Sequence, residues 1–135
     1  MSTRTIFLAR LIGLFSLVVS VAMFLHQQAM VEIVTAMVRD PPLLFILGML
    51  GLLAGLAMVL AHNVWSGGAL PIVVTLFGWI LLIRGAILLL LPPDTLASLM
   101  ESIHFERLFY FSAGITLVLG LYLTYAGFKA PPPSR

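Results

Sequence analysis

The sequence contains no cysteine and very few charged residues, and both absences limit what the protein can be. Without cysteine, a disulfide framework, thiol redox chemistry and cysteine-ligated metal sites are excluded. Charged residues make up 9% of the 135 residues and hydrophobic residues 61%. An ordinary soluble domain has about 25% charged residues. So few charges cannot cover the surface of a water-soluble domain, and the composition therefore predicts an integral membrane protein. The net charge of +2 is too small to indicate a nucleic-acid partner.

Four long apolar runs are present, at residues 5–25, 43–61, 71–91 and 108–128; the first contains Arg10 and the third contains Arg84, while the other two contain no charge. Each is close to the roughly 20 residues that an α-helix needs to cross a hydrocarbon layer of about 30 Å. Within a bilayer these runs must be helical, because only a helix satisfies all of its backbone groups internally. The prediction is a polytopic all-α protein, with residues 1–135 forming one membrane domain of four transmembrane helices.

Two amphipathic segments, residues 27–39 and 94–107, separate the first span from the second and the third from the fourth. Apolar residues recur in them at the helical spacing i, i+3, i+4, i+7: Met30, Ile33, Val34 and Met37 in one, and Leu96, Leu99, Met100 and Ile103 in the other. This pattern predicts two short interfacial helices. Pro41 and Pro42 are expected to end the first segment and begin the second span. Asp94 is expected to be the N-cap of the second segment.

Both halves of the chain follow the order span, interfacial helix, span. An offset of 65 residues also aligns three pairs of small residues, Gly13 with Gly78, Gly55 with Gly120, and Ser20 with Gly85. Identity elsewhere is poor, so two explanations stay open. The halves are either a parallel internal repeat or two helical hairpins that are alike only in hydropathy.

The charges are sorted between the two ends of the predicted spans. Four basic residues belong to the terminal segments, namely Arg4, Arg10, Lys129 and Arg135. All five acidic residues lie in the two interfacial segments or directly after the first, namely Glu32, Asp40, Asp94, Glu101 and Glu106. The positive-inside rule then predicts a multi-pass protein of a bacterial inner membrane, with both termini in the cytoplasm and the interfacial helices at the outer surface.

Arg84 is the most informative charged residue, because it lies well inside the third predicted span. It stands seven residues before Leu91, roughly 10 Å from the outer end at 1.5 Å per residue. An arginine at the bilayer centre costs about 2.5–3.5 kcal/mol on insertion scales. One interpretation is an anchor for an anionic head, a quinone carbonyl or a partner's carboxylate. The other is a side chain that extends outward to a phosphate or pairs with Glu32, Glu101 or Glu106.

Trp79 is unusual near the middle of a span, because tryptophan prefers the membrane interface. Its indole N–H needs an acceptor, for which Thr75 is the candidate, although Trp79 is also readily explained as a packing residue. The candidate ligand- or lipid-binding residues are therefore Arg84, Trp79, Thr75 and Glu32. His62, Asn63 and Trp65 are interpreted as a polar cluster at the cytoplasmic interface, with a proton-carrying His62 as the alternative.

Small residues mark two spans for close helix packing, which lets helices approach where lipid provides no hydrophobic force between them. They are Gly48, Gly51 and Gly55 in the second span, and Ser112, Thr116, Gly120 and Thr124 in the fourth. Such faces serve either the internal bundle or a partner. The proline-rich tail, residues 130–135, is a further candidate for contact with a partner.

Metal and cofactor sites are not expected. His104 with Glu101 and Glu106 is the nearest approach to a metal site, and is interpreted as part of a solvated helical face.

Residues 62–85 resemble a group of small bacterial integral membrane proteins with four predicted spans. In that group His-Asn-x-Trp precedes Gly-Trp-x-x-Leu-x-(Arg/Lys)-Gly, and residues 62–65 and 78–85 match these two motifs. The resemblance implies four spans and a joint importance of Trp79 and Arg84, but no activity.

The leading functional hypothesis is a non-enzymatic protein that acts through helix association. It would be an accessory or assembly subunit of a membrane complex, or a homo-oligomer, in contact with membrane lipid. The alternative is a lipid- or small-molecule-binding protein, or a minimal transporter, that uses Arg84 as an anion anchor. An enzyme is not expected, because no nucleophile paired with a base is identifiable.

Overall fold

The computed structural model describes residues 2–102 and 105–130, with all side chains in these ranges except those of residues 100, 101, 105 and 106. These ranges contain six helices: α1 (Thr3–Leu25), α2 (Gln27–Val38), α3 (Pro41–Ala61), α4 (Ala69–Leu90), α5 (Pro93–Ser102) and α6 (Phe105–Lys129). Four of them, α1, α3, α4 and α6, are long and apolar enough to cross a membrane. The all-α prediction with four spans and two short intervening helices is confirmed.

Two predictions around α5 need correction. The interfacial segment 94–107 is not one helix, because α5 ends at Ser102 and residues 105–107 already belong to α6. Asp94 is not the N-cap, because α5 begins one residue earlier, at Pro93. The carbonyl of Pro92 accepts the backbone N–H groups of Thr95 and Leu96. Proline suits the first helical position, since its missing N–H would have no partner there.

The boundaries around α3 follow from local chemistry. Asp40 caps the helix, and its Oδ1 accepts the backbone N–H of Leu43 at 3.1 Å. The two prolines after it occupy the first turn, as predicted. At the other end the chain turns through residues 62–68, where Gly67 and Gly68 have φ values of 91° and 117°. These left-handed conformations favour glycine and allow the tight return into α4.

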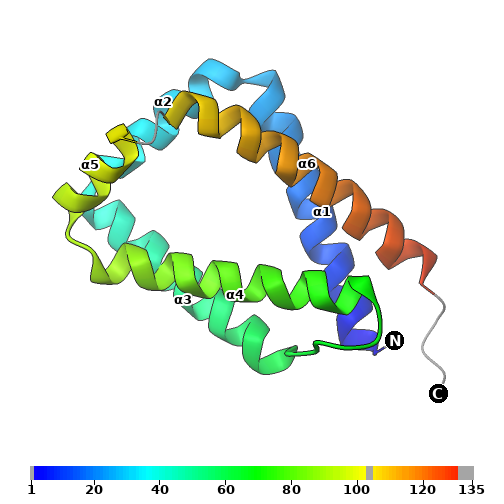
Figure 1. Ribbon diagram of the computed structural model, residues 1–135. Helices are drawn as coiled ribbons and strands as arrows, with labels where there is room; N and C mark the ends of the chain where they lie inside the picture. The colour runs from blue at the N-terminus through cyan, green and yellow to red at the C-terminus, as the bar shows by residue number, and fades with distance from the viewer. Residues whose placement is uncertain (1, 103–104, 131–135) are drawn as a thin grey trace.

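The four long helices form two pairs, α1 with α6 and α3 with α4 (Figure 1). The pairs meet near the N-terminus and the 62–68 turn, and they diverge toward the opposite end, where α2 and α5 contact each other. We call the first end the basic end, since it carries Arg4, Arg10 and Lys129, and the second the acidic end, since it carries Glu32, Asp40 and Asp94. A buried apolar cluster joins the pairs at the basic end; it comprises Ala9, Ile12, Leu70, Val74 and Leu123.

Two of the close helix contacts agree with the 65-residue offset noted in the sequence. A Cβ atom on Gly55 would collide with the backbone of Leu82, and a Cβ atom on Gly120 would lie 3.0 Å from the backbone nitrogen of Leu17. Residues 55 and 120 are equivalent in the repeat, and so are residues 17 and 82. The unit α1–α2–α3 therefore corresponds to α4–α5–α6, and each unit contributes one helix to each pair. The two halves of the chain are therefore intertwined, because each helix pair combines one helix from each half.

A candidate binding cavity between the helix pairs

The small residues singled out in α3 pack inside the protein. Gly48 and Gly55 face leucine residues of α4, and a Cβ atom on Gly51 would lie 3.4 Å from the Cα atom of Gly85. The backbones of α3 and α4 therefore lie almost in contact at Gly51 and Gly85, and the glycine face predicted from the sequence is used within this pair.

The small residues of α6 are used in part in the same way against α1. Gly120 is buried against α1, and the Thr124 Oγ1 atom would lie 2.6 Å from a Cβ atom on Gly13. This oxygen is buried and has no hydrogen-bond partner among the described residues. Thr116 is half-buried, whereas Ser112 is exposed and donates to the carbonyl of Phe109 at 2.8 Å.

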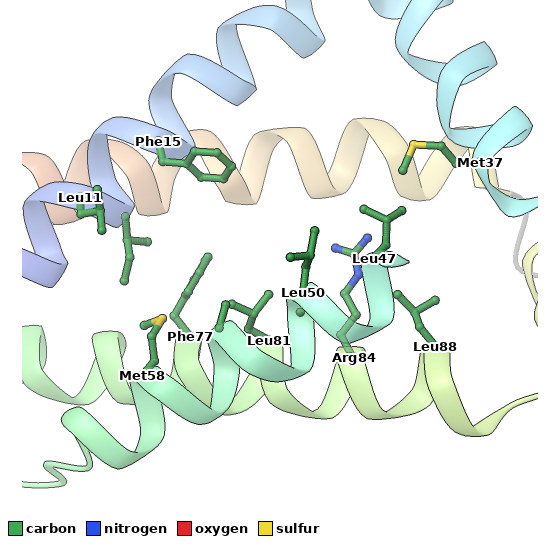
Figure 2. A pocket seen from close by; sticks show the side chains of 14 residues that line it. Leu11, Phe15, Met37, Leu47, Leu50, Met58, Phe77, Leu81, Arg84 and Leu88 are labelled. Carbon is green, nitrogen blue, oxygen red and sulfur yellow. The ribbon is translucent and has the colours of Figure 1, made fainter. Parts of the chain in front are cut away.

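A cavity of about 660 Å³ lies between the helix pairs (Figure 2). It falls within the range of small-molecule sites, about 300–1,000 Å³. Its walls are apolar except for Arg84. They come from α1, α2, α3 and α4 and consist of Leu11, Ile12, Phe15, Met37, Leu47, Leu50, Gly51, Ala54, Met58, Phe77, Leu81, Arg84, Gly85 and Leu88.

The cavity has a definite floor and a definite upper end. Ile12, Met58 and Phe77 line it and also belong to, or pack on, the apolar cluster that joins the helix pairs at the basic end. Met37 of α2 and Leu88 of α4 lie at its opposite end, toward α2 and α5 (Figure 2). The cavity is therefore closed toward the basic end by packed side chains and extends toward the acidic end.

Arg84 extends from α4 into this cavity, between Leu50 and Leu88 (Figure 2). It makes no hydrogen bond or ion pair with any described residue. Glu32, one of its expected partners, is exposed on α2 and is not part of the cavity wall, while the side chains of Glu101 and Glu106 lie outside the described set. Among the described side chains, the positive charge of Arg84 thus has an apolar cavity beside it and no counter-ion.

Thr75 and Trp79 lie on the same helix as Arg84 but do not line the cavity. Thr75 is buried, and its Oγ1 atom accepts the N–H of Val64 at 3.1 Å and donates to the carbonyl of Val64 at 3.0 Å. This side chain therefore fastens the 62–68 turn to α4 and does not serve the indole of Trp79. Of the four candidate binding residues, the structure brings Arg84 alone into the cavity.

The interfacial cluster is divided in the structure. The indole N–H of Trp65 donates to Oδ1 of Asn63 at 2.7 Å, and both residues are exposed, as expected at an interface. His62, however, is buried, with Nε2 3.4 Å from the carbonyl oxygen of Pro71. His62 is buried because the 62–68 turn folds back against the start of α4, and this contact covers the imidazole ring.

No metal site is found in the ranges 2–102 and 105–130, where no three His, Asp or Glu side chains are grouped to hold an ion. His104 falls between these ranges, and the proline-rich tail beyond Ala130 follows them, so both predictions lie outside the described residues.

Comparisons with protein-family models, with curated proteins and with solved structures give no match to this chain. The motif resemblance of residues 62–65 and 78–85 therefore agrees with the structure in the number of candidate spans, and membership of that group stays a prediction.

One polar contact within the α1–α6 pair was not foreseen from the sequence. Nε of Arg10 donates to the carbonyl of Gly127 at 2.9 Å, and its guanidinium lies 4.8 Å from the ring centre of Phe128. Carbonyls in the last turn of a helix have no internal partner, and a cation there is favourable. Arg10 thus caps α6 at the basic end, in contrast to Arg84, for which the described residues provide no partner.

Proposed function

We propose that this membrane protein binds an anionic amphiphile of the bilayer in the cavity between its helix pairs, with Arg84 as the anchor for the negative head. The observation that carries the proposal is that Arg84 has no hydrogen-bond or ion-pair partner among the described residues and lies beside an apolar cavity of about 660 Å³. A charge at membrane depth is costly without a partner, and an anionic head would supply that partner while its apolar part fills the cavity.

Other polar side chains in the spans support this interpretation by contrast. Thr75 is satisfied by the backbone of Val64, Ser20 donates to the carbonyl of Leu17 at 3.0 Å, and Arg10 is bound to the carbonyl of Gly127. These three polar side chains have a partner inside the protein, whereas the Thr124 Oγ1 atom has none among the described residues. Arg84 has no such partner among the described residues, and its side chain lies in the cavity wall.

The role as an accessory subunit or homo-oligomer stays a prediction. That prediction depended on small-residue faces, and the glycines of α3 are used between α3 and α4, as Gly120 is between α1 and α6. We therefore favour binding, without catalysis, over association. By the positive-inside rule we assign the protein to the inner membrane of a bacterium, with the basic end in the cytoplasm and the cavity extending toward the outer surface.

Native mass spectrometry of the protein, extracted gently from its membrane, tests this function. The wild-type protein is expected to retain an anionic lipid-like molecule, which Arg84→Leu loses. Arg39→Leu is the matched control, since Arg39 is exposed next to α2 and does not line the cavity. Arg84→Lys keeps the positive charge but loses the planar guanidinium group, which binds an oxyanion through two hydrogen bonds. This variant should therefore retain part of the binding. Equal retention in wild-type and Arg84→Leu protein would contradict the proposal.

A further inference from the structure

We infer, on the basis of the binding function proposed above, that the ligand is a single-chain amphiphile with an oxyanion head, and that it occupies the leaflet at the acidic end. The chemistry required is one acyl chain joined to a carboxylate or a phosphate, as in a fatty acid or a lysophospholipid. Three properties of the cavity lead to this class: its length, its volume and its closed floor.

The length of the cavity corresponds to one leaflet. Along α4 its wall runs from Phe77 to Leu88, which is about 16 Å at 1.5 Å per residue. The hydrocarbon layer is about 30 Å thick, so one leaflet contributes about half of that. A ligand in the cavity therefore lies alongside the acyl chains of the acidic-end leaflet.

The volume of the cavity suits one chain and not two. At about 30 Å³ for a group the size of a water molecule, the 660 Å³ of the cavity accommodates roughly twenty such groups. A methylene group is of similar size, so the cavity has the volume for one acyl chain of about 16–18 carbons, provided that the chain is bent, because Arg84 and the floor are only about 10 Å apart along α4. A two-chain phospholipid brings about twice that number, and its second chain would remain outside the cavity.

The floor of the cavity fixes the direction of the ligand. Ile12, Met58 and Phe77 close the basic end through the apolar cluster, so the end of the chain points toward them. Arg84 lies seven residues nearer the acidic end than Phe77, or about 10 Å of helix, and receives the oxyanion. Arginine is well suited to this role because its guanidinium binds carboxylate and phosphate oxygens through two parallel hydrogen bonds. The closed floor makes this a one-sided site that holds its ligand and does not pass it across the membrane.

Photo-crosslinking in nanodiscs of zwitterionic two-chain phosphatidylcholine tests this inference. A benzophenone side chain replaces Leu50, which lines the cavity, or Ile80, which does not; the two are 58% and 64% exposed. Four probes are compared: palmitate, lysophosphatidylglycerol, lysophosphatidylcholine and two-chain phosphatidylglycerol. We expect palmitate, lysophosphatidylglycerol or both to crosslink at position 50 but not at position 80, and the probe that does so identifies the head as carboxylate or phosphate.

The two single-chain anions should exceed lysophosphatidylcholine, whose choline cation offsets its phosphate charge, about tenfold or more, the effect of one charged hydrogen-bonded contact. They should also exceed two-chain phosphatidylglycerol, whose head can reach Arg84 but whose second chain has no place in the cavity. Equal crosslinking of two-chain phosphatidylglycerol would overturn the single-chain inference and leave the proposed function standing. No preference of any anion for position 50 over position 80 would overturn both.

Two variants separate loss of the site from loss of the fold. Arg84→Gln, combined with the benzophenone at position 50, should lower crosslinking of the single-chain anions to the level of lysophosphatidylcholine. Leu47→Trp fills the cavity and leaves Arg84 in place, and should lower crosslinking of every single-chain probe while the helical circular-dichroism spectrum is unchanged. Full crosslinking of folded Leu47→Trp protein would show that the chain does not occupy this cavity, and would overturn the inference.

The leaflet is tested with lysophosphatidylglycerol, which crosses bilayers slowly, added to one side of oriented proteoliposomes. Prompt crosslinking at position 50 is expected when the probe is added on the side of α2 and α5. Prompt crosslinking from the opposite side would overturn the assignment of the leaflet.

Discussion

Gly13→Ala is expected to destabilise the protein through the contact between α1 and α6. The new Cβ atom would lie 2.6 Å from both the backbone nitrogen and Oγ1 of Thr124, and 3.0 Å from the carbonyl carbon of Leu123. The nitrogen and the carbonyl carbon belong to the backbone, so no side-chain rotation relieves the overlap. The two helices must separate by about 0.8 Å to reach ordinary contact at 3.4 Å, and a gap of that size forfeits about a quarter to a half of each dispersion contact.

The magnitude follows from two opposing effects. Overpacking of this kind costs about 1–3 kcal/mol, while alanine is favoured over glycine inside a helix by about 1 kcal/mol. The net loss expected for Gly13→Ala is thus up to about 2 kcal/mol. Gly78→Ala, at the equivalent position of the repeat, should cost less, because its Cβ would lie 3.1 Å from the Met58 Cβ and 3.6 Å from the nearest backbone atom. Gly114→Ala meets nothing within 4 Å and should be neutral or stabilising by up to about 1 kcal/mol.

Unfolding of the three variants in mixed micelles of increasing dodecyl sulfate content, followed by far-ultraviolet circular dichroism, measures these differences. The expected order of stability is Gly114→Ala above Gly78→Ala above Gly13→Ala. If Gly13→Ala and Gly114→Ala unfold at the same dodecyl sulfate fraction, the close contact of α1 with α6 is refuted.

Three further outcomes are expected. Thr75→Val removes both hydrogen bonds that fasten the turn to α4, and should lower the free energy of unfolding by about 1–3 kcal/mol and speed proteolysis within the turn; an unchanged cleavage rate would contradict this. Fragments 1–66 and 67–135, expressed together, should copurify as one complex, whereas each alone should fail to accumulate, because the main partner of every long helix is in the other fragment. Cysteines placed singly at Ser66 and Ser98 of this cysteine-free chain should react with an impermeant maleimide from the cytoplasmic and the outer side, respectively; the reverse pattern would invert the orientation.

The number and limits of the spans were predictable because they depend on local properties. A run of apolar residues of sufficient length has to be a helix in a bilayer, and Asp40 with the prolines after it marks the start of α3 by itself. The predicted boundary between the second interfacial segment and the fourth span was wrong, because no change in composition marks the point where α5 ends and α6 begins. Glu106 and Arg107 look like the polar end of an interfacial helix, but they belong to the first turns of α6.

The cavity was only half predictable. Arg84 was identified, since a charge in a span is conspicuous in any sequence. The wall was not, because Phe15 and Leu50 do not differ in type from the many leucines and phenylalanines that face lipid. Thr75 and His62 show the opposite error. Their polar side chains suggested a functional site from the sequence, but in the structure they hold the 62–68 turn against α4. Which apolar surfaces meet depends on the pairing of α1 with α6 and α3 with α4, which hydropathy does not encode.

The intertwined pairing has a consequence for biosynthesis. The main partner of α1 is α6, which begins 80 residues after α1 ends at Leu25. At about 5–20 residues per second, α1 remains in the membrane for roughly 4–16 s before α6 emerges from the ribosome. During that interval the bare backbone at Gly13 and the guanidinium of Arg10 have no partner from their own chain, whereas α3 receives α4 almost at once. The first helix thus obtains its main partner only when the last helix has been made. In a chain that is terminated early, the face of α1 that normally packs on α6 stays exposed and can associate with helices of other membrane proteins.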